Sequence, residues 1–160
     1  KLPITFYTST DELPDFQDYS MKNRTYRYYQ GKPLYHFGHG LSYTDFNIGK
    51  AKIKNKKGVG AVLTVPVTNK GKMAGTETVQ VYVSRPVDVD GPSMQLRDFA
   101  RVELRPGETK KVEFKLDENA FLWFDPANEE MLPLAGDYII RYGSSSDAAQ
   151  LQSVKFTYKP

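Results

Sequence analysis

Val-Gly-Ala-Val-Leu-Thr-Val-Pro-Val-Thr-Asn, residues 59–69, is the stretch that decides the fold class. Its apolar residues alternate, which is the pattern of an extended strand with one buried face. Residues 76–85, Thr-Glu-Thr-Val-Gln-Val-Tyr-Val-Ser-Arg, repeat the pattern. The side chains predicted to face inward are Leu63, Val65 and Val67 in the first stretch and Val79, Val81 and Val83 in the second.

Similar short runs, separated by turn residues, continue on both sides of these two stretches. The predicted strands are Ile48–Lys54, Val59–Asn69, Thr76–Arg85, Leu96–Leu104, Thr109–Leu116, Asp137–Gly143 and Gln150–Tyr158. The last strand but one places Tyr138, Ile140 and Tyr142 on one face. The pattern predicts an all-β chain, an immunoglobulin-like antiparallel β-sandwich of about seven strands.

Local details are also predicted. Pro66, on the outward face of its strand, indicates a sheet edge or a bulge. Arg105-Pro106-Gly107-Glu108 predicts a tight turn that joins the flanking strands as a hairpin. Residues 117–120 predict one short helical turn, and residues 126–133 predict a loop.

The first 46 residues have a different composition from the rest. They hold eleven of the 21 aromatic residues but show no sustained helical or strand periodicity. Such a segment cannot form a core of its own, and exposing many rings to water is unfavourable. We therefore expect residues 1–46 to be an aromatic-rich connector and residues 47–160 to be the sandwich. The connector must lie on the sandwich or on a domain outside these residues.

Composition excludes several classes of function. The net charge is +3, from 22 basic and 19 acidic residues, which argues against a nucleic-acid partner. The chain has no cysteine, and no apolar run approaches the length of a membrane span. Since the first residue is Lys1 rather than methionine, we expect the chain to be cut from a longer protein.

Residues with catalytic or ligand-binding chemistry are few. His36 and His39 are the only histidines, too few for a zinc site without cysteine, so they are interpreted as ordinary loop residues. Five lysines within residues 50–57 are interpreted as a solvated edge strand. The carboxylates of polar, turn-like segments, which lack the apolar surroundings of a catalytic acid, are Asp11, Glu12, Asp15, Asp18, Glu129 and Glu130. The residues therefore predict no catalytic site, metal or cofactor.

Several motifs together resemble one family. They are Arg-Thr-Tyr-Arg-Tyr-Tyr (24–29), Phe-Gly-His-Gly-Leu-Ser-Tyr-Thr-Asp-Phe (37–46), Val-Thr-Asn-Lys-Gly (67–71), Val-Gln-Val-Tyr-Val (79–83) and Gln-Leu-Arg-Asp-Phe (95–99). This combination resembles the C-terminal, fibronectin type III-like domain of glycoside hydrolase family 3 enzymes, of the bacterial β-xylosidase and β-glucosidase type. The sequence departs from the family at His36, where proline is frequent, and at His39, where an aromatic residue is frequent.

The resemblance implies a secreted parent, periplasmic or extracellular, that cleaves β-linked sugars with retention in upstream domains. The fragment itself then has no catalytic residue and no cofactor. Its partners are those upstream domains and, in some members, a second subunit. Aromatic residues of the connector are predicted to dock on the upstream domains: Tyr26, Tyr28, Tyr29, Tyr35, Phe37 and Tyr43.

Two other functions stay open from the residues. A carbohydrate-binding module would present exposed rings, such as Trp123, Tyr28 or Tyr35, to a polysaccharide. A cell-surface adhesion sandwich would have the same fold, although the family-like connector argues against it.

Overall fold

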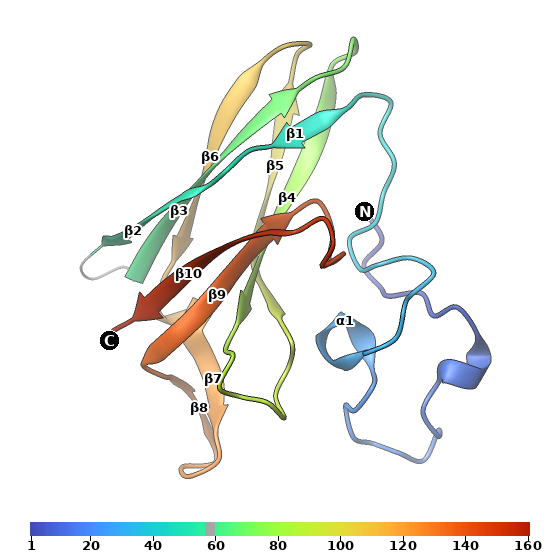
Figure 1. Ribbon diagram of the computed structural model, residues 1–160, viewed down its shortest axis with the longest axis vertical. Helices are drawn as coiled ribbons and strands as arrows, with labels where there is room; N and C mark the ends of the chain where they lie inside the picture. Colours follow the sequence, from blue (N-terminus) through green and yellow to red (C-terminus); the bar gives the residue numbers. More distant parts are fainter. Residues whose placement is uncertain (57–59) are drawn as a thin grey trace.

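Strands of two facing sheets dominate the computed structural model, which describes residues 1–56 and 60–160 (Figure 1). The connector carries a 3₁₀ turn, η1 (Thr10–Glu12), and a one-turn helix, α1 (Thr25–Tyr28). A second 3₁₀ turn, η2 (Glu118–Phe121), confirms the predicted helical turn. The strands are β1 (Phe46–Ile48), β2 (Lys52–Lys56), β3 (Gly60–Asn69), β4 (Gly75–Ser84), β5 (Gln95–Leu104), β6 (Thr109–Leu116), β7 (Leu122–Asp125), β8 (Glu130–Pro133), β9 (Gly136–Gly143) and β10 (Gln152–Tyr158).

All the strand pairs are antiparallel in the part of the chain that the structure describes. In one sheet β3 pairs with β6 on one side and with β1 and β2 on the other. The second sheet has the order β10-β9-β4-β5, and β7 and β8 form a separate hairpin. Since β1 and β2 occupy one edge position, the sandwich has seven strand positions. The predicted all-β sandwich is therefore confirmed.

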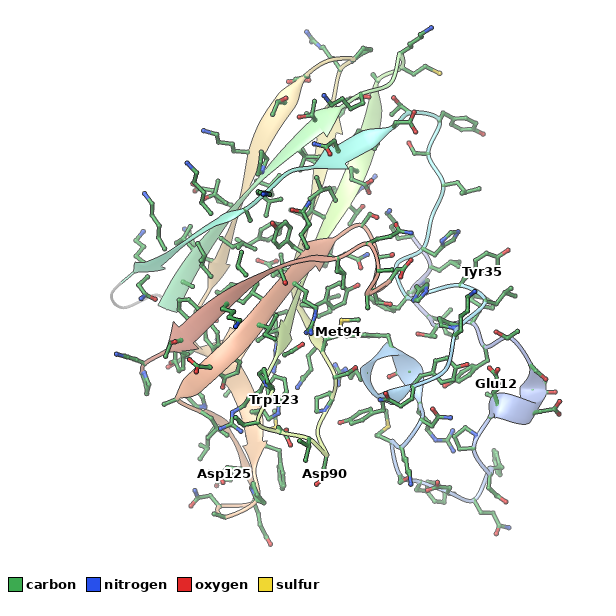
Figure 2. The ribbon with its side chains drawn as sticks, viewed as in Figure 1. Glu12, Tyr35, Asp90, Met94, Trp123 and Asp125 are labelled. Carbon is green, nitrogen blue, oxygen red and sulfur yellow. The ribbon has the colours of Figure 1, made fainter. Side chains whose placement is uncertain are left out.

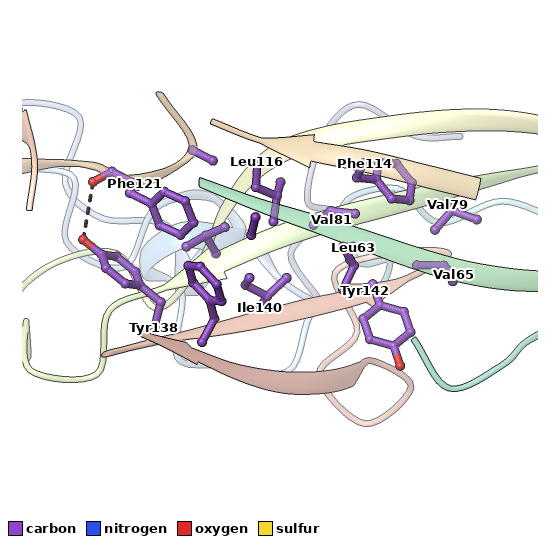
Figure 3. Close-up of a cluster of buried hydrophobic side chains, with 14 of the residues drawn as sticks. Leu63, Val65, Val79, Val81, Phe114, Leu116, Phe121, Tyr138, Ile140 and Tyr142 are labelled. Carbon is purple, nitrogen blue, oxygen red and sulfur yellow. Dashed lines mark hydrogen bonds between the residues drawn. The ribbon is translucent and has the colours of Figure 1, made fainter. Parts of the chain in front are cut away.

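The core lies between the sheets (Figure 3). The side chains predicted to face inward are all buried: Leu63, Val65, Val67, Val79, Val81, Val83, Tyr138, Ile140 and Tyr142. Phe121 of η2 also belongs to this core and stacks on Tyr158 of β10, with the ring centroids 4.3 Å apart. Fully burying one such apolar side chain stabilises the fold by about 1.5–3 kcal/mol, so this interface supplies most of the driving force for folding.

The edge of the first sheet contains a bulge, as Pro66 indicated. Ile48 pairs with Val67 and Lys52 with Thr64, so the edge strand has one residue more than β3 between these pairs. Gly49 N donates to the carbonyl oxygen of Pro66 at 2.8 Å within this break. The single strand predicted at Ile48–Lys54 is therefore two strands, β1 and β2.

The lysines of β2 lie on an edge strand, because β2 pairs only with β3 among the described residues. Lys52, Lys54 and Lys56 are exposed, which agrees with the interpretation of a solvated edge that discourages further strand pairing. Lys57 and Val59, which belonged to the predicted lysine run and to the predicted second strand, lie outside the described residues.

The predicted hairpin around residues 105–108 is wrong, although the tight turn is present. Glu108 N donates to the carbonyl oxygen of Arg105 at 3.0 Å, and Gly107 has φ +76°. The strands on either side nevertheless belong to different sheets, β5 pairing with β4 and β6 with β3. Because the chain passes from one sheet to the other at this turn, Val102 of β5 and Phe114 of β6 reach the common core from opposite sheets.

The predicted loop at residues 126–133 is also wrong. Only residues 126–129 form a turn, in which Ala127 N and Asn128 Nδ2 donate to the Asp125 carboxylate. Glu129 has φ +55° there. The chain then returns as β8, which pairs with β7 from Leu122 opposite Pro133 to Asp125 opposite Glu130.

Asn69 ties the end of β3 to three other segments. Its buried side chain accepts from Thr44 Oγ1 at 2.7 Å and Gly71 N at 3.0 Å, and donates to the carbonyl oxygens of Met73 and Leu104. The side-chain amide is fully satisfied, which is the condition for burying it without a large cost.

Candidate functional site: an aromatic surface on the connector

The connector, residues 1–46, forms a closed loop beside the sandwich (Figure 1). Its two arms pair with each other: Leu2 N donates to the carbonyl oxygen of His39 at 2.8 Å, and Phe6 N donates to that of Tyr35 at 2.9 Å. Lys1 Nζ also lies 3.0 Å from Glu77 Oε1 of β4. The ends of the connector are thereby held together and against the second sheet.

Polar contacts brace the inside of this loop. The Arg24 guanidinium donates to the backbone carbonyls of Asp15, Asp18 and Ser20. The Tyr29 hydroxyl donates to Glu12 Oε2 at 2.5 Å. This hydrogen bond to a carboxylate raises the pKa of Tyr29 to about 12, because ionisation of the phenol would break it.

An aromatic clamp fixes the connector to the sandwich. Tyr26 of α1 stacks on Phe37, with ring centroids 4.6 Å apart, and meets the buried Tyr82 of β4 edge-on at 5.7 Å. The Tyr26 hydroxyl accepts from Leu96 N at 2.9 Å. Ser93 donates to the carbonyl oxygen of Arg27 through both its backbone N and its hydroxyl. These contacts join α1 to β4 and to the start of β5.

The clamp explains why both faces of β4 are buried. Gln80, Tyr82 and Ser84 point away from the core, yet their exposed fractions are 4%, 0% and 5%. Burial also raises the pKa of Tyr82 far above its ordinary value. Gly38, with φ +80°, allows close approach, because a Cβ atom there would lie 2.4 Å from the Gln80 side chain. Part of the connector therefore does pack on the sandwich.

Other aromatic and aliphatic side chains of the connector point to solvent. Phe16, Tyr19, Leu41 and Tyr43 are each more than 90% exposed. Ile4, Leu13, Met21 and Leu34 are about half exposed, at 46–57%. Exposed apolar residues concentrated in one segment are typical of a surface that another protein surface covers. We call the four most exposed residues, three aromatic residues and Leu41, the outward aromatic surface; the name covers two segments, since Phe16 and Tyr19 lie before α1 and Leu41 and Tyr43 lie before β1.

Of the six residues predicted to dock on other domains, two belong to the clamp, one belongs to the outward aromatic surface and three belong to neither. Tyr26 and Phe37 belong to the clamp, and Tyr29 packs on Tyr7. Tyr28 is half-buried, and Tyr35, labelled in Figure 2, is 42% exposed and packs edge-on against Phe6. Only Tyr43 belongs to the outward aromatic surface. Their docking role stays a prediction. Phe16, Tyr19 and Leu41 were not predicted, and the signal that marks them is an apolar residue within polar, turn-rich sequence.

The two histidines have ordinary contacts. His36 Nε2 lies 3.7 Å from Asp147 Oδ1, and the His39 ring lies against Tyr35. Within residues 1–56 and 60–160 no group of three potential ligands could hold a metal ion. Among the same residues no helix has the length and apolar character needed to cross a bilayer.

The carboxylates considered for glycoside cleavage lie on the surface. Asp11, Asp15, Asp18, Glu129 and Glu130 are exposed. Glu12 is half-buried but accepts hydrogen bonds from Tyr29 and from Thr8 N. None of them has the apolar burial that characterises a catalytic acid.

Trp123 is not available to a sugar. It is 1% exposed, its Nε1 donates to Asp88, and the Arg97 guanidinium lies 5.8 Å from its ring centroid. Figure 2 shows Trp123 at the β7–β8 hairpin, whereas Tyr35 lies in the connector. The hypothesis that Trp123 is an exposed sugar platform is wrong, because the ring instead joins the hairpin to the loop that contains Asp88.

Residues 77–146 match the fibronectin type III-like domain family. Over 98% of its length the chain is 42% identical to a xylan 1,4-beta-xylosidase of Xylanibacter ruminicola, of which it covers 18%. It is 40% identical to the thermostable beta-glucosidase B of Acetivibrio thermocellus over 139 residues, covering 81% of the chain and 18% of that enzyme.

A solved structure shows the same relation. The GH3 beta-glucosidase of Bifidobacterium adolescentis superposes with a TM-score of 0.73 at 32% identity, over 82% of this chain and 20% of that one. The chain thus spans about a fifth of the length of the relatives that it matches, and the matched part is C-terminal.

Proposed function

Because the chain belongs to the fibronectin type III-like C-terminal domains of glycoside hydrolase family 3 β-glycosidases, we propose that it is a non-catalytic docking domain of such an enzyme. In this proposal residues 47–160 form the domain and residues 1–46 connect it to the catalytic domains upstream. The parent hydrolyses terminal β-linked xylose or glucose with retention. The observation that carries the proposal is the outward aromatic surface, which consists of Phe16, Tyr19, Leu41 and Tyr43. No other residue that the structure describes covers these side chains.

The relatives support the proposal by their size. Each has about four-fifths of its length outside the matched region, which leaves ample polypeptide to cover the outward aromatic surface. The proposed partner is therefore the upstream part of the same chain. A second subunit at this surface would instead make the uncleaved parent elute as a dimer whose population falls on dilution, which gel filtration of the uncleaved parent measures.

We also propose that the parent enzyme works in the periplasm or outside the cell. A relative named for xylan supports this, since a polysaccharide is met outside the cytoplasm. Fractionation of the source cells with an antibody to these 160 residues tests the location.

The experiment uses the full parent polypeptide with a specific protease site placed before Lys1. After cleavage, the 160-residue fragment should co-elute with the upstream part at micromolar concentration, and the complex should still hydrolyse 4-nitrophenyl β-xyloside or β-glucoside. The separated fragment should hydrolyse neither substrate. Hydrolysis by the pure fragment, or its complete release after cleavage, would overturn the proposal.

Replacing Leu41 and Tyr43 with serine tests the surface itself. Two well-covered apolar side chains account for several kcal/mol of association at about 1.5–3 kcal/mol each, so the double variant should release the fragment. Val89→Ser is the matched control, because Val89 is 86% exposed on a loop outside the connector.

A further inference from the structure

The outward face of the first sheet carries a concentration of positive charge. Successive residues of a strand point to opposite faces. The inward positions of β3 and β6 are buried, and exposed lysines occupy the outward positions of β2 and β6. The charged side chains on this outward face are Lys52, Lys54, Lys56, Lys111 and Lys115, with one carboxylate, Glu113. We call this surface the lysine face.

The strand register brings these lysines together from two strands that are far apart in the sequence. Lys54 pairs with Val62 of β3, and Val62 pairs with Lys115 of β6, so the two lysines flank one half-buried valine. Lys111 lies opposite Pro66, farther along β3. Neighbouring strands are about 4.8 Å apart, so the two rows of lysines run about 10 Å apart on either side of β3.

The charge of the lysine face is not balanced by its neighbours. Five of the 22 basic residues but only one of the 19 acidic residues lie on it, so its excess of positive charge is larger than the net +3 of the whole chain. None of the five lysines forms an ion pair with a residue that the structure describes. Protection of two sheet edges accounts for lysines on β2 and β6, but it does not account for the near absence of carboxylates between them. A bound polyanion would relieve the mutual repulsion of these lysines.

The lysine face lacks the side chains that hold a nucleic acid or enter a bilayer. The positions between the two rows are occupied by residues without an aromatic ring: Val62, Thr64, Pro66 and Thr68. Single-stranded nucleic acid is held by bases that stack on aromatic rings, and an interfacial contact with a bilayer needs large apolar side chains. The face instead offers hydroxyls, since Thr68 Oγ1 and Thr109 Oγ1 are exposed and 2.8 Å apart. Ammonium and hydroxyl groups together suit the carboxylates and hydroxyls of an acidic polysaccharide.

We propose that the lysine face binds a polysaccharide that carries carboxylates, such as a polymer of uronic acids. The choice of a polysaccharide rests on the proposed function, because a parent that hydrolyses β-linked sugars acts where such polymers occur. The lysine face and the connector lie on opposite sides of the sandwich, since Tyr26 of the connector packs on the outward face of β4 in the second sheet. Figure 1 shows β2 and β6 well apart from α1. Docking through the connector therefore does not by itself cover the lysine face.

The test measures binding of the 160-residue chain to polygalacturonate, which has a carboxylate on every sugar, and to the same polymer after reduction of its carboxyl groups to alcohols. The chain should bind polygalacturonate at low ionic strength, and binding should weaken as salt is added, because charges on an exposed face are screened. It should bind the reduced polymer much more weakly. Equal binding to the two polymers, or no binding to polygalacturonate, would overturn the proposal.

Substitutions locate the binding. The double variant Lys54→Gln, Lys115→Gln removes one lysine from each row and should weaken binding about tenfold, since each exposed ion pair contributes a few-fold. Lys22→Gln, Lys155→Gln is the matched control, because it makes the same change in net charge at exposed lysines in the connector and on β10 of the second sheet. This control should bind as wild type does. Lys54→Arg, Lys115→Arg keeps the charge and should also bind as wild type does. The melting temperature should change by no more than about 2 °C in each variant, since only exposed side chains are replaced.

The remaining outcomes separate this proposal from its alternatives. If the two glutamine double variants weaken binding equally, net charge alone decides and the lysine face is not a site. Tighter binding to phosphatidylglycerol vesicles or to DNA than to polygalacturonate would show that the occupant is not a polysaccharide. In the parent cleaved before Lys1, Lys54→Gln, Lys115→Gln should leave co-elution of the two pieces unchanged. Loss of polygalacturonate binding with intact co-elution in wild type rejects only the lysine-face proposal, whereas release of the wild-type fragment rejects the proposed docking function.

Discussion

Replacing Tyr26 with alanine should detach the connector from the sandwich while leaving the core between the two sheets intact. The ring stacks on Phe37, touches Tyr82 and accepts a hydrogen bond from Leu96 N. A half-buried tyrosine ring covers roughly 100 Å² of apolar surface, worth about 2.5 kcal/mol. The lost hydrogen bond adds about 1 kcal/mol. The free energy that holds α1 on β4 should therefore fall by about 3–4 kcal/mol.

Two measurements follow this loss in the 160-residue chain. Trypsin cleavage after Lys22 and Lys32, which lie on either side of α1, should accelerate by roughly two to three orders of magnitude if cleavage follows the population of the detached state. Hydrogen exchange of the Leu96 amide, which donates to the Tyr26 hydroxyl, should accelerate by a similar factor. Amides of β3, in the other sheet, should keep their protection.

Two control variants separate the contributions. Tyr26→Phe retains the stacked ring and removes only the acceptor, so it should cost about 1 kcal/mol. Tyr19→Ala removes a ring that is 93% exposed and should change stability by less than about 0.5 kcal/mol. If Tyr26→Ala is cleaved no faster than Tyr19→Ala, the connector is not held by the clamp and our account of the buried outer face of β4 is wrong.

Three further substitutions test other parts of the structure. Asn69→Ala removes four side-chain hydrogen bonds from a fully buried site and should lower the free energy of unfolding by about 3–5 kcal/mol in urea denaturation; a loss below about 1 kcal/mol contradicts this. Gly38→Ala places a Cβ at φ +80° against Gln80 and should lower the melting temperature through a loss of about 1–3 kcal/mol, whereas an unchanged value would show that Gln80 moves aside freely. Burial, and then the charge of Asp117, raise the pKa of Asp98 above 3.8, so its ionised form opposes folding at neutral pH and its protonated form does not. Asp98→Asn should therefore be more stable than wild type at pH 7, and this advantage should shrink as the pH falls towards 4; an advantage that grows on acidification would reverse the assigned sign.

Alternation along a strand was sufficient to predict which side chains form the core. Leu63, Val79 and Ile140 are buried because successive residues of a strand point to opposite faces, and that information is local. The choice of strand partner is not local. Residues 105–108 have the composition of a hairpin turn and do form the turn, but β4 already pairs with β5 and β3 with β6. The choice of partner depends on how both sheets pack together over one core, which involves residues far apart in the sequence.

The clamp shows a second limit of the alternating pattern. Gln80 and Tyr82 have the sequence positions of solvent-facing residues, and a single strand gives no sign that a connector from 40 or more residues earlier covers them. The only local hint is Tyr82, a large ring at an outward position. Burial on the second face of β4 depends on α1 and on Gly38, whose lack of a side chain lets the connector approach Gln80.

The aromatic residues of the connector are alike in sequence but different in what holds them. Tyr26 and Tyr43 both lie in motifs that resemble the same family, yet Tyr26 packs on Tyr82 and Tyr43 is 95% exposed. The difference arises because the paired arms of residues 2–6 and 34–39 hold the connector beside β4, whereas the Leu41 and Tyr43 side chains are exposed on the segment that crosses to β1. A rigid connector presents those rings in a fixed position, which reduces the entropy lost when another domain covers them. The clamp and the outward aromatic surface therefore act together: weakening Tyr26 should weaken docking even though its ring points into this chain.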